Sequence, residues 1–218
     1  MLIRWVQCSF VSVLFFLYVG SAYGLVISKV DNTFLVVDGS STFASVDVLA
    51  GDFLGGAGAI SKVVITVDFA KCDDPALSSS SRSCIGLGDS FNREIAFSLI
   101  SPLGTTVDLV RRDLTYDGQT PGARVQVTFD DDALIPVGGN ELLSGIFSPE
   151  GVLSDFFGES ALGAWRLFIE DTDAGDPLAY FRLQLDITVD DPVPVPLPST
   201  MALLLIGLQM LYFFRRTR

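Results

Sequence analysis

The stretch AYFRLQLDITV, residues 179–189, indicates how most of this chain folds. Apolar and polar side chains alternate along it. The apolar set is Phe181, Leu183, Leu185, Ile187 and Val189, and the polar residues between them are Arg182, Gln184, Asp186 and Thr188. A β-strand turns successive side chains to opposite faces, so this pattern predicts a strand with one face in a core and the other in water.

The same period of two recurs in four earlier segments: 60–69 (ISKVVITVDF), 93–99 (REIAFSL), 123–130 (ARVQVTFD) and 164–171 (AWRLFIED). We expect one face of each segment to point inward. The inward set is Ser61, Val63, Ile65, Val67, Phe69, Ile95, Phe97, Leu99, Val125, Val127, Phe129, Trp165, Leu167 and Ile169. Turn-forming sequences such as SPLG and DAGDP separate the segments, and residues 149–163 offer at most a short turn of helix. The sequence therefore predicts an all-β fold, an antiparallel β-sandwich.

The chain begins like a secreted protein. Arg4 precedes an apolar run at 10–19, and the small residues of GSAYG follow at 20–24. This order is typical of a secretory signal peptide, which we expect to be cleaved after Gly24. An uncleaved anchor is the alternative, but ten apolar residues are too few to cross about 30 Å of hydrocarbon. The predicted organisation is a signal peptide at 1–24, a sandwich domain at 25–189, a spacer at 190–198 and a sorting tail at 195–218.

The sandwich domain is strongly acidic. Without the four arginines of the two ends, 10 basic residues face 26 acidic ones, which gives a net charge of about −16. Such a body is repelled by nucleic acid and by anionic membrane surfaces, so we expect no nucleic-acid partner.

Two cysteines remain after the signal peptide, which contains Cys8. Cys72 and Cys84 bracket a serine-rich segment, and in an exported protein this arrangement predicts a disulfide between them. Half of a zinc site is the alternative. Because the chain has no histidine and no other cysteine after residue 24, zinc lacks its remaining ligands.

The lack of histidine also excludes Ser-His and Cys-His nucleophilic catalysis. A glycosidase would need two carboxylates across a cleft, and the sequence identifies no such pair, so we expect no enzyme activity. We expect the acidic segment EDTDAGD to be a solvated loop, as acidic clusters at strand ends usually are. Calcium is the alternative, because it prefers oxygen ligands, and its ligands would be Asp171, Asp173 and Asp176.

An SPxGT turn and a later GE…G.W…D string accompany the alternating segments. They comprise Ser101, Pro102, Gly104, Thr105, Gly158, Glu159, Gly163, Trp165 and Asp171. Through these elements, residues 58–189 resemble the P domain (P/Homo B) that follows the catalytic domain of subtilisin-like proprotein convertases. The resemblance implies a jelly-roll-like sandwich without catalytic residues. The segment 70–92 departs from the family, because a cysteine-bounded insertion stands where such domains usually carry a histidine and an acidic turn.

Two residues of that string also have a direct structural interpretation. We expect Trp165 to fill the core. Glu159 follows a glycine near a turn, so we expect its carboxylate to cap backbone N–H groups.

The tail combines three physical features. Prolines at 192, 194, 196 and 198 favour an extended, stiff spacer at 190–198. An apolar run follows, and from Leu197 it is just long enough to span a membrane. The chain then ends in a basic stop, which we expect on the cytoplasmic side; it consists of Arg215, Arg216 and Arg218.

This tail resembles the PEP-CTERM signal that exosortases read in Gram-negative bacteria that secrete exopolysaccharide. The matching motif is Val195, Pro196, Leu197, Pro198, Ser199 and Thr200, with leucine at 197 where the family usually has glutamate. The LPxTG signal of sortases is a second interpretation, although Met201 replaces its glycine, and a plain membrane anchor is a third.

These features predict an exported, non-enzymatic protein of the cell envelope or extracellular matrix. The expected partners are an exosortase-type transpeptidase, the inner membrane for a transient period, and exopolysaccharide or another surface component. The alternative is a P-domain-like protein-binding module that supports an exported protease or other partner.

Overall fold

The computed structural model describes residues 24–53, 58–73, 84 and 88–190. These residues form strands and three one-turn 3-10 helices. The first strands are β1 (Leu25–Asp31), β2 (Leu35–Val37), β3 (Ser40–Val48), β4 (Ile60–Lys71), β5 (Asp89–Phe91) and β6 (Ile95–Ile100). The later strands are β7 (Thr106–Val110), β8 (Gln119–Pro121), β9 (Ala123–Phe129), β10 (Gly145–Phe147), β11 (Gly163–Asp171) and β12 (Leu178–Val189). The short helices are η1 (Ala50–Asp52), η2 (Asn92–Glu94) and η3 (Leu153–Phe156).

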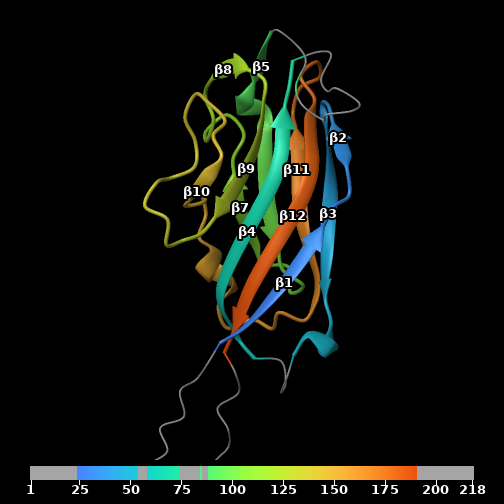
Figure 1. Ribbon diagram of the computed structural model, residues 1–218, viewed down its shortest axis with the longest axis vertical. Coiled ribbons are helices and arrows are strands. Elements are labelled where there is room, and N and C mark those ends of the chain that lie inside the picture. The colour runs from blue at the N-terminus through green and yellow to red at the C-terminus, as the bar shows by residue number, and fades with distance from the viewer. Residues whose placement is uncertain (1–23, 54–57, 74–83, 85–87, 191–218) are drawn as a thin grey trace, which may run out of the picture.

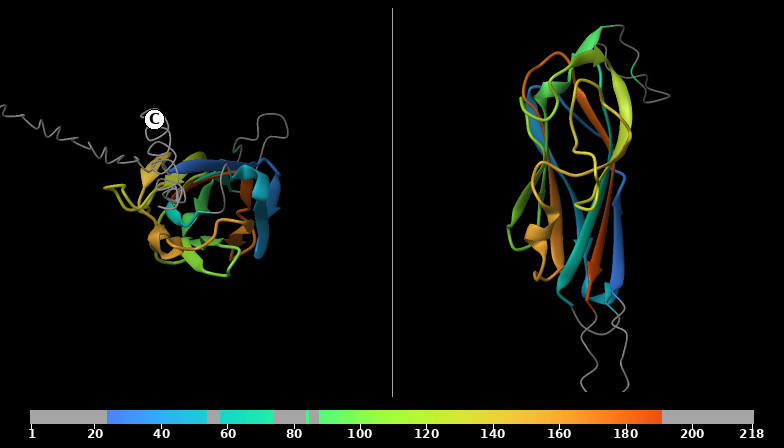
Figure 2. Two further views of the ribbon diagram at one scale, coloured as in Figure 1. Left: turned by 90° about the horizontal axis from the view of Figure 1, so that it is seen from below. Right: turned by 90° about the vertical axis from the view of Figure 1, so that its left-hand side faces the viewer.

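Two sheets face each other as the layers of a sandwich (Figures 1 and 2). We call the sheet with the order β1-β12-β4-β9-β10, to which β2 adds through β12, sheet I. Sheet II has the order β3-β11-β6-β7, and β5 and β8 form a separate pair. This arrangement confirms the predicted all-β sandwich. One pairing differs from an antiparallel sheet, because β10 lies parallel to β9 at the edge of sheet I.

The core lies between the sheets and contains nearly all of the apolar residues predicted to face inward, while Ser61 is partly exposed. Val67 of sheet I and Leu167 of sheet II are both fully buried. Aromatic rings of the two sheets also meet, since Phe69 packs edge-on against Phe97 at 4.9 Å. The alternation of apolar and polar residues thus determines which face of each strand packs against the shared core.

Phe181 is an exception, and its predicted place in the main core is wrong. The pairing of β12 with β4 shifts register between Tyr180 and Arg182, so Tyr180 takes the core position. Phe181 instead packs on the outside of sheet I, in a small cluster with Ala70, Cys72 and Ala179. A bulge reverses the facing of side chains on one side of it, which a constant period of two does not predict.

The first and last strands of the domain pair directly. Leu25 lies opposite Val189, so residues 24 and 190 leave the sandwich at the same end (Figure 1). The end of β4 that precedes Cys72 lies at the other end of the sandwich, near β5 and β8 (Figure 1). No helix long and apolar enough to cross a membrane occurs within the described ranges. The predicted signal peptide and the tail beyond Asp190 lie outside them.

Candidate functional site

A lysine occupies the core face of sheet I at the end away from the termini. Lys71 continues the alternation that points Val67 and Phe69 into the core, and its side chain has no exposed surface. A buried ammonium is costly unless it is paired, so its neighbours decide what this site is.

The Lys71 ammonium contacts carboxylates carried by the opposite side of the sandwich. Its Nζ lies 2.9 Å from both carboxylate oxygens of Asp171, which ends β11. It also lies 2.8 Å from Oε2 of Glu94, the last residue of η2. Glu94 is 6% exposed and Asp171 is not exposed at all, so this cluster of three charges is closed to water.

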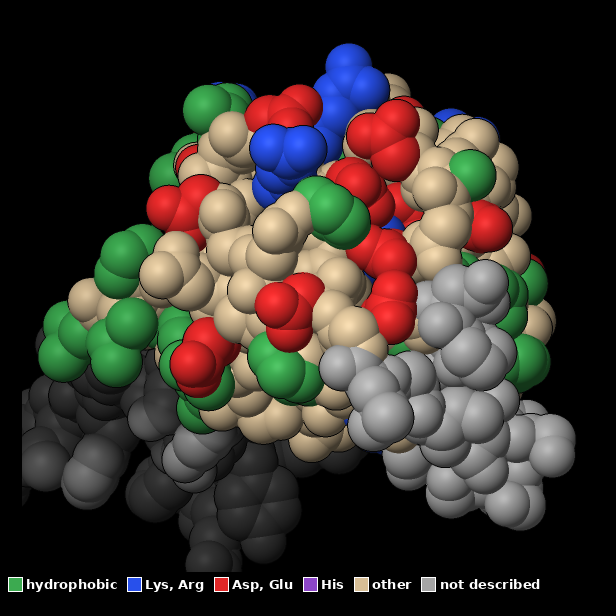
Figure 3. Space-filling view, turned by 90° about the horizontal axis from the view of Figure 1, so that it is seen from above, with side chains coloured by type: hydrophobic (Ala, Val, Ile, Leu, Met, Phe, Trp, Pro, Cys, Tyr) green, Lys and Arg blue, Asp and Glu red, His purple; other side chains and the backbone are tan. Residues whose placement is uncertain are grey.

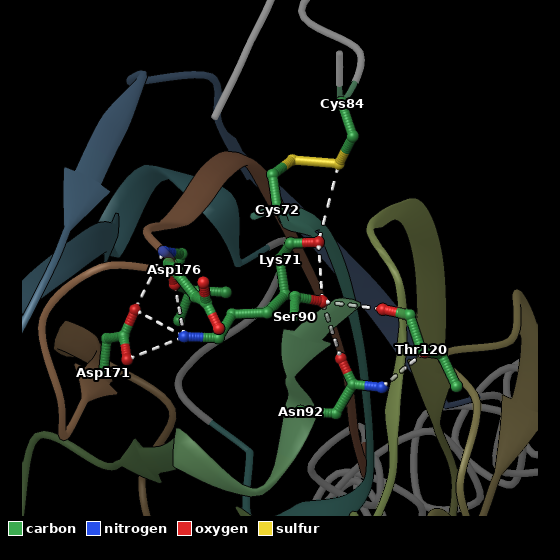
Figure 4. The surroundings of a disulfide bond; sticks show 9 residues. Lys71, Cys72, Cys84, Ser90, Asn92, Thr120, Asp171 and Asp176 are labelled. Atoms are coloured by element: carbon green, nitrogen blue, oxygen red, sulfur yellow. Dashed lines mark hydrogen bonds and ion pairs between the residues drawn. A yellow bond between two sulfur atoms is a disulfide. The ribbon is translucent and has the colours of Figure 1, made fainter. Parts of the chain in front are cut away.

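Backbone groups complete the cluster (Figure 4). Lys71 Nζ donates to the backbone carbonyl of Asp176, and the backbone N–H of Leu178 donates to Asp171 Oδ2 at 3.0 Å. The Asp176 carboxylate turns away and accepts from the Phe91 N–H at 2.9 Å. The segment from β11 to β12 thus wraps around the ammonium, and we refer to Lys71, Glu94 and Asp171 as the lysine cluster.

The pKa of Asp171 is raised to about 6 from its ordinary value of 3.8. Burial is the main cause, because it disfavours the charged carboxylate. The hydrogen bond and the positive charge of Lys71 act in the opposite direction, and the nearby Glu94 charge adds to the rise. The carboxyl group of Asp171 therefore exchanges its proton at about pH 6, well above the range of an exposed aspartate.

The calcium site predicted at Asp171, Asp173 and Asp176 has no counterpart in this geometry. Asp171 binds the lysine, Asp176 caps a backbone N–H, and Asp173 is exposed and contributes its carbonyl to Gly39. Within the described ranges, no three His, Cys, Asp or Glu side chains are grouped so that they could hold a metal ion. The cation that contacts Asp171 in this structure is the ammonium of Lys71.

The sequence indicated that Lys71 is buried, although this was not predicted. Residue 71 is in phase with the inward residues of β4, so a lysine there needs a buried carboxylate as its partner. The partners themselves could not be found this way, because Asp171 is 100 residues distant.

The disulfide between Cys72 and Cys84 is confirmed. It follows Lys71 directly, and buried polar groups surround this end of β4 (Figure 4). Ser90 Oγ lies 3.4 Å from the Lys71 carbonyl, and the Asn92 amide donates to Thr120 Oγ1 at 2.9 Å. The covalent bond and this network hold the β4 end against the β5–β8 pair.

Trp165 fills the core as predicted, and it is fully buried. Its indole N–H donates to the Ala161 carbonyl at 2.9 Å. The prediction for Glu159 needs correction, because its carboxylate accepts from the Thr105 hydroxyl instead of backbone N–H groups. The second carboxylate oxygen of Glu159 is buried and has no hydrogen-bond partner among the residues that the structure describes. Glu159 thus ties the SPxGT turn to the start of β11.

The outer face of sheet II carries a shallow hollow of about 370 Å³, which we call the sheet II groove. Ion pairs flank it, with Arg111 2.9 Å from Asp108 and Arg112 4.0 Å from Glu170. Its lining residues come from β6, β7, the turn after β7, and β11. They are Ala96, Ser98, Asp108, Val110, Arg111, Arg112, Leu114, Phe168 and Glu170.

An aromatic surface continues from this groove. Phe168 lies opposite Phe43 in the register of β11 and β3, and their rings are 5.4 Å apart. Phe43 is 48% exposed, and the Arg166 guanidinium lies 5.3 Å from the centre of its ring. The face therefore offers rings, guanidinium groups and carboxylates side by side.

The end of the molecule near β5 and β8 is acidic (Figure 3). Exposed carboxylates come from loops that meet there, because Asp38 accepts from the Gly175 N–H and Asp173 accepts from Gly39. Asp89 starts β5 at the same end. The surface charge expected from composition is thus present around the buried lysine cluster.

The predicted sorting motif Val195–Thr200 and the basic stop of Arg215, Arg216 and Arg218 lie outside the described residues. Their roles stay predictions from the sequence.

Comparisons with known proteins leave the assignment open. No family matches the sequence in a scan of protein-family models, and no curated protein matches it. A solved complex of the Aeromonas sobria serine protease and the chaperone matches with 14% identity and a TM-score of 0.35. That match covers 77% of this chain and 27% of the other. A structure of the Aeromonas sobria serine protease matches with 12% identity, a TM-score of 0.35, and coverage of 75% and 27%. At these values neither match carries an argument, and this chain spans only about a quarter of the matched chains.

Proposed function

We propose that this protein is an exported, non-enzymatic binding module of the cell envelope or matrix, sorted through its C-terminal tail. The observation that carries the binding role is the sheet II groove, with the partly exposed Phe168 ring and its paired charges. Binding sites commonly combine apolar walls with a few polar groups that fix orientation, and this groove has both.

The position of the chain ends supports display on a surface. Because Leu25 pairs with Val189, a tail beginning at Asp190 leaves the sandwich at one end. The groove includes Glu170, which lies next to the opposite end of β11. A tail held by an exosortase-type enzyme would therefore place the Glu170 end of the groove on the side away from the membrane.

The chemistry of the groove favours a neutral glycan. Asp108 and Glu170 balance Arg111 and Arg112, so the groove carries no excess positive charge for an anionic polymer. The acidic body would repel such a polymer as well. Carboxylates and guanidinium groups hydrogen-bond neighbouring sugar hydroxyls, and the partly exposed Phe168 ring offers an apolar face to a sugar ring.

The test is a binding assay of the exported protein against immobilised neutral and uronate-containing oligosaccharides. We expect binding of neutral chains, and Phe168→Ala and Arg112→Ala should each weaken it about tenfold or more. Arg124→Ala is the matched control, because this arginine pairs with Asp68 on the outer face of sheet I. Equal loss in the control, or binding of uronates alone, would contradict the proposal.

A second candidate, a protein-binding module, rests on a different surface. Leu134 and Ile135, in the segment between β9 and β10, are 98% and 61% exposed, and Ile146 of β10 is 62% exposed. Contiguous apolar exposure is typical of contact surfaces between proteins. Leu134→Asp should abolish co-purification of such a partner while leaving glycan binding unchanged; a partner retained by this variant would count against this surface.

A further inference from the structure

We propose that Lys71 and Asp171 join covalently in the folded protein, forming an amide between the lysine Nζ and the aspartate Cγ with Glu94 as proton carrier. The proposal is independent of the glycan-binding role. It rests on the arrangement of the lysine cluster, which holds an amine nucleophile, a carboxyl electrophile and a second carboxyl group in one closed site.

The reacting groups are already in contact. Lys71 Nζ is 2.9 Å from both oxygens of Asp171, so the carbon between those oxygens lies within the roughly 3–3.5 Å that precedes bond formation. Both side chains are fully buried and fixed at the ends of β4 and β11. Such fixed proximity replaces the high concentration that this reaction needs in solution.

Burial also favours the reactive protonation states. An ammonium does not attack, and a carboxylate is a poor electrophile, but a site closed to water disfavours both charges. Lys71 passes a proton to Glu94 at 2.8 Å and becomes a neutral amine. Glu94 then gives this proton to Oδ1 of Asp171, whose raised pKa favours its uptake, so Glu94 is a carboxylate again before the amine attacks.

Each atom of the reaction has a place in the structure. The Lys71 nitrogen attacks Asp171 Cγ, and the Leu178 N–H, 3.0 Å from Oδ2, stabilises the negative charge that develops there. Glu94 takes a proton from the nitrogen and gives one to Oδ1, whose bond to carbon breaks as water leaves. One ammonium and one carboxylate thus become one amide and one water, and Glu94 returns to its starting form.

The product also fits the site. The N–H of the new amide would donate to the backbone carbonyl of Asp176, which now accepts from Lys71 Nζ. The amide oxygen would still accept from the Leu178 N–H. The bond would join sheet I to sheet II across 100 residues, beside the Cys72–Cys84 disulfide. It would fasten the sandwich at the end opposite the tail.

The test is the intact mass of the purified, exported protein after reduction of its disulfide. We expect the folded wild type to be lighter than its sequence by one water, and protein kept unfolded in urea from synthesis onward to have the full mass. After digestion, the missing water should map to a branched peptide that contains Lys71 and Asp171. A wild type of full mass, or a loss that maps to a succinimide at Asp117, next to Gly118, would overturn the proposal.

The variant Glu94→Gln tests whether the cross-link needs the proton carrier, while leaving the fold intact. Glutamine keeps the size of the side chain but cannot carry the proton, so this variant should fold and retain its full mass. Lys71→Arg should also retain full mass. Far-UV circular dichroism checks folding, and cross-linking of Glu94→Gln at the wild-type rate would show that Glu94 has no part in the reaction as proposed.

Discussion

Replacing Trp165 by alanine tests the core assignment most directly. The indole is fully buried, packs edge-on against Phe156 at 5.1 Å, and donates to the Ala161 carbonyl. Emptying such a site costs about 3–5 kcal/mol, and the unpaired carbonyl adds about 1–3 kcal/mol. The expected loss is thus about 5 kcal/mol, comparable with the whole unfolding free energy of a marginal domain.

Two further variants divide this loss into its parts. Trp165→Phe keeps much of the apolar volume but removes the N–H donor, so we expect about 1–3 kcal/mol. Arg166→Ala is the control on the same strand. Its guanidinium is exposed and lies over the Phe43 ring, so its loss should cost at most about 1 kcal/mol.

The measurement is urea unfolding followed by far-UV circular dichroism. Fluorescence is unsuitable, since Trp165 is the only tryptophan after residue 24 and the substitution removes the signal. If Trp165→Ala unfolds at the same urea concentration as Arg166→Ala, the strand does not face the core as described and the reasoning fails.

Three other outcomes are expected. Cys72 and Cys84 should both resist thiol labelling in the unfolded, unreduced protein, and Cys84→Ser should lower the unfolding free energy by about 3 kcal/mol; two reactive thiols would refute the pairing. In Glu94→Gln, Asp171 stays free and buried. Because its pKa is raised in the folded state, folded Asp171 keeps its proton at pH values at which unfolded Asp171 has lost it. Its unfolding free energy should therefore fall by on the order of 2 kcal/mol as the pH rises from about 4 through about 6, and a flat series of urea midpoints would contradict this. Pro196→Ala/Pro198→Ala should accumulate as a full-length membrane form, and removal of the terminal arginines should release an uncut chain. Mass spectrometry of the C-terminus in hosts with and without an exosortase checks this, and identical trimming in both would leave only a simple anchor.

The sequence by itself determined the fold class and most of the core. Segments such as 123–129 and 163–171 alternate so regularly that only one face can be buried, and this local property needs no knowledge of the partner strand. The disulfide was also predictable, since two cysteines in a domain that is predicted to be exported and lacks histidine leave few alternatives. The strands at 25–31 and 40–48 were not singled out, because serine, alanine and aspartate weaken the contrast between their faces.

Only the tertiary structure decided where the charged and aromatic groups meet. The bulge after Tyr180 moves Phe181 out of the main core, and it depends on pairing with β4. The three aspartates near 171–176 look alike in the sequence, yet one binds an ammonium from the opposite sheet and another caps a backbone N–H. Contacts between residues 100 positions apart depend on how the sheets stack, and no local pattern encodes that distance. For this reason the sequence suggested a calcium ion beside Asp171, where the folded protein places the ammonium of Lys71.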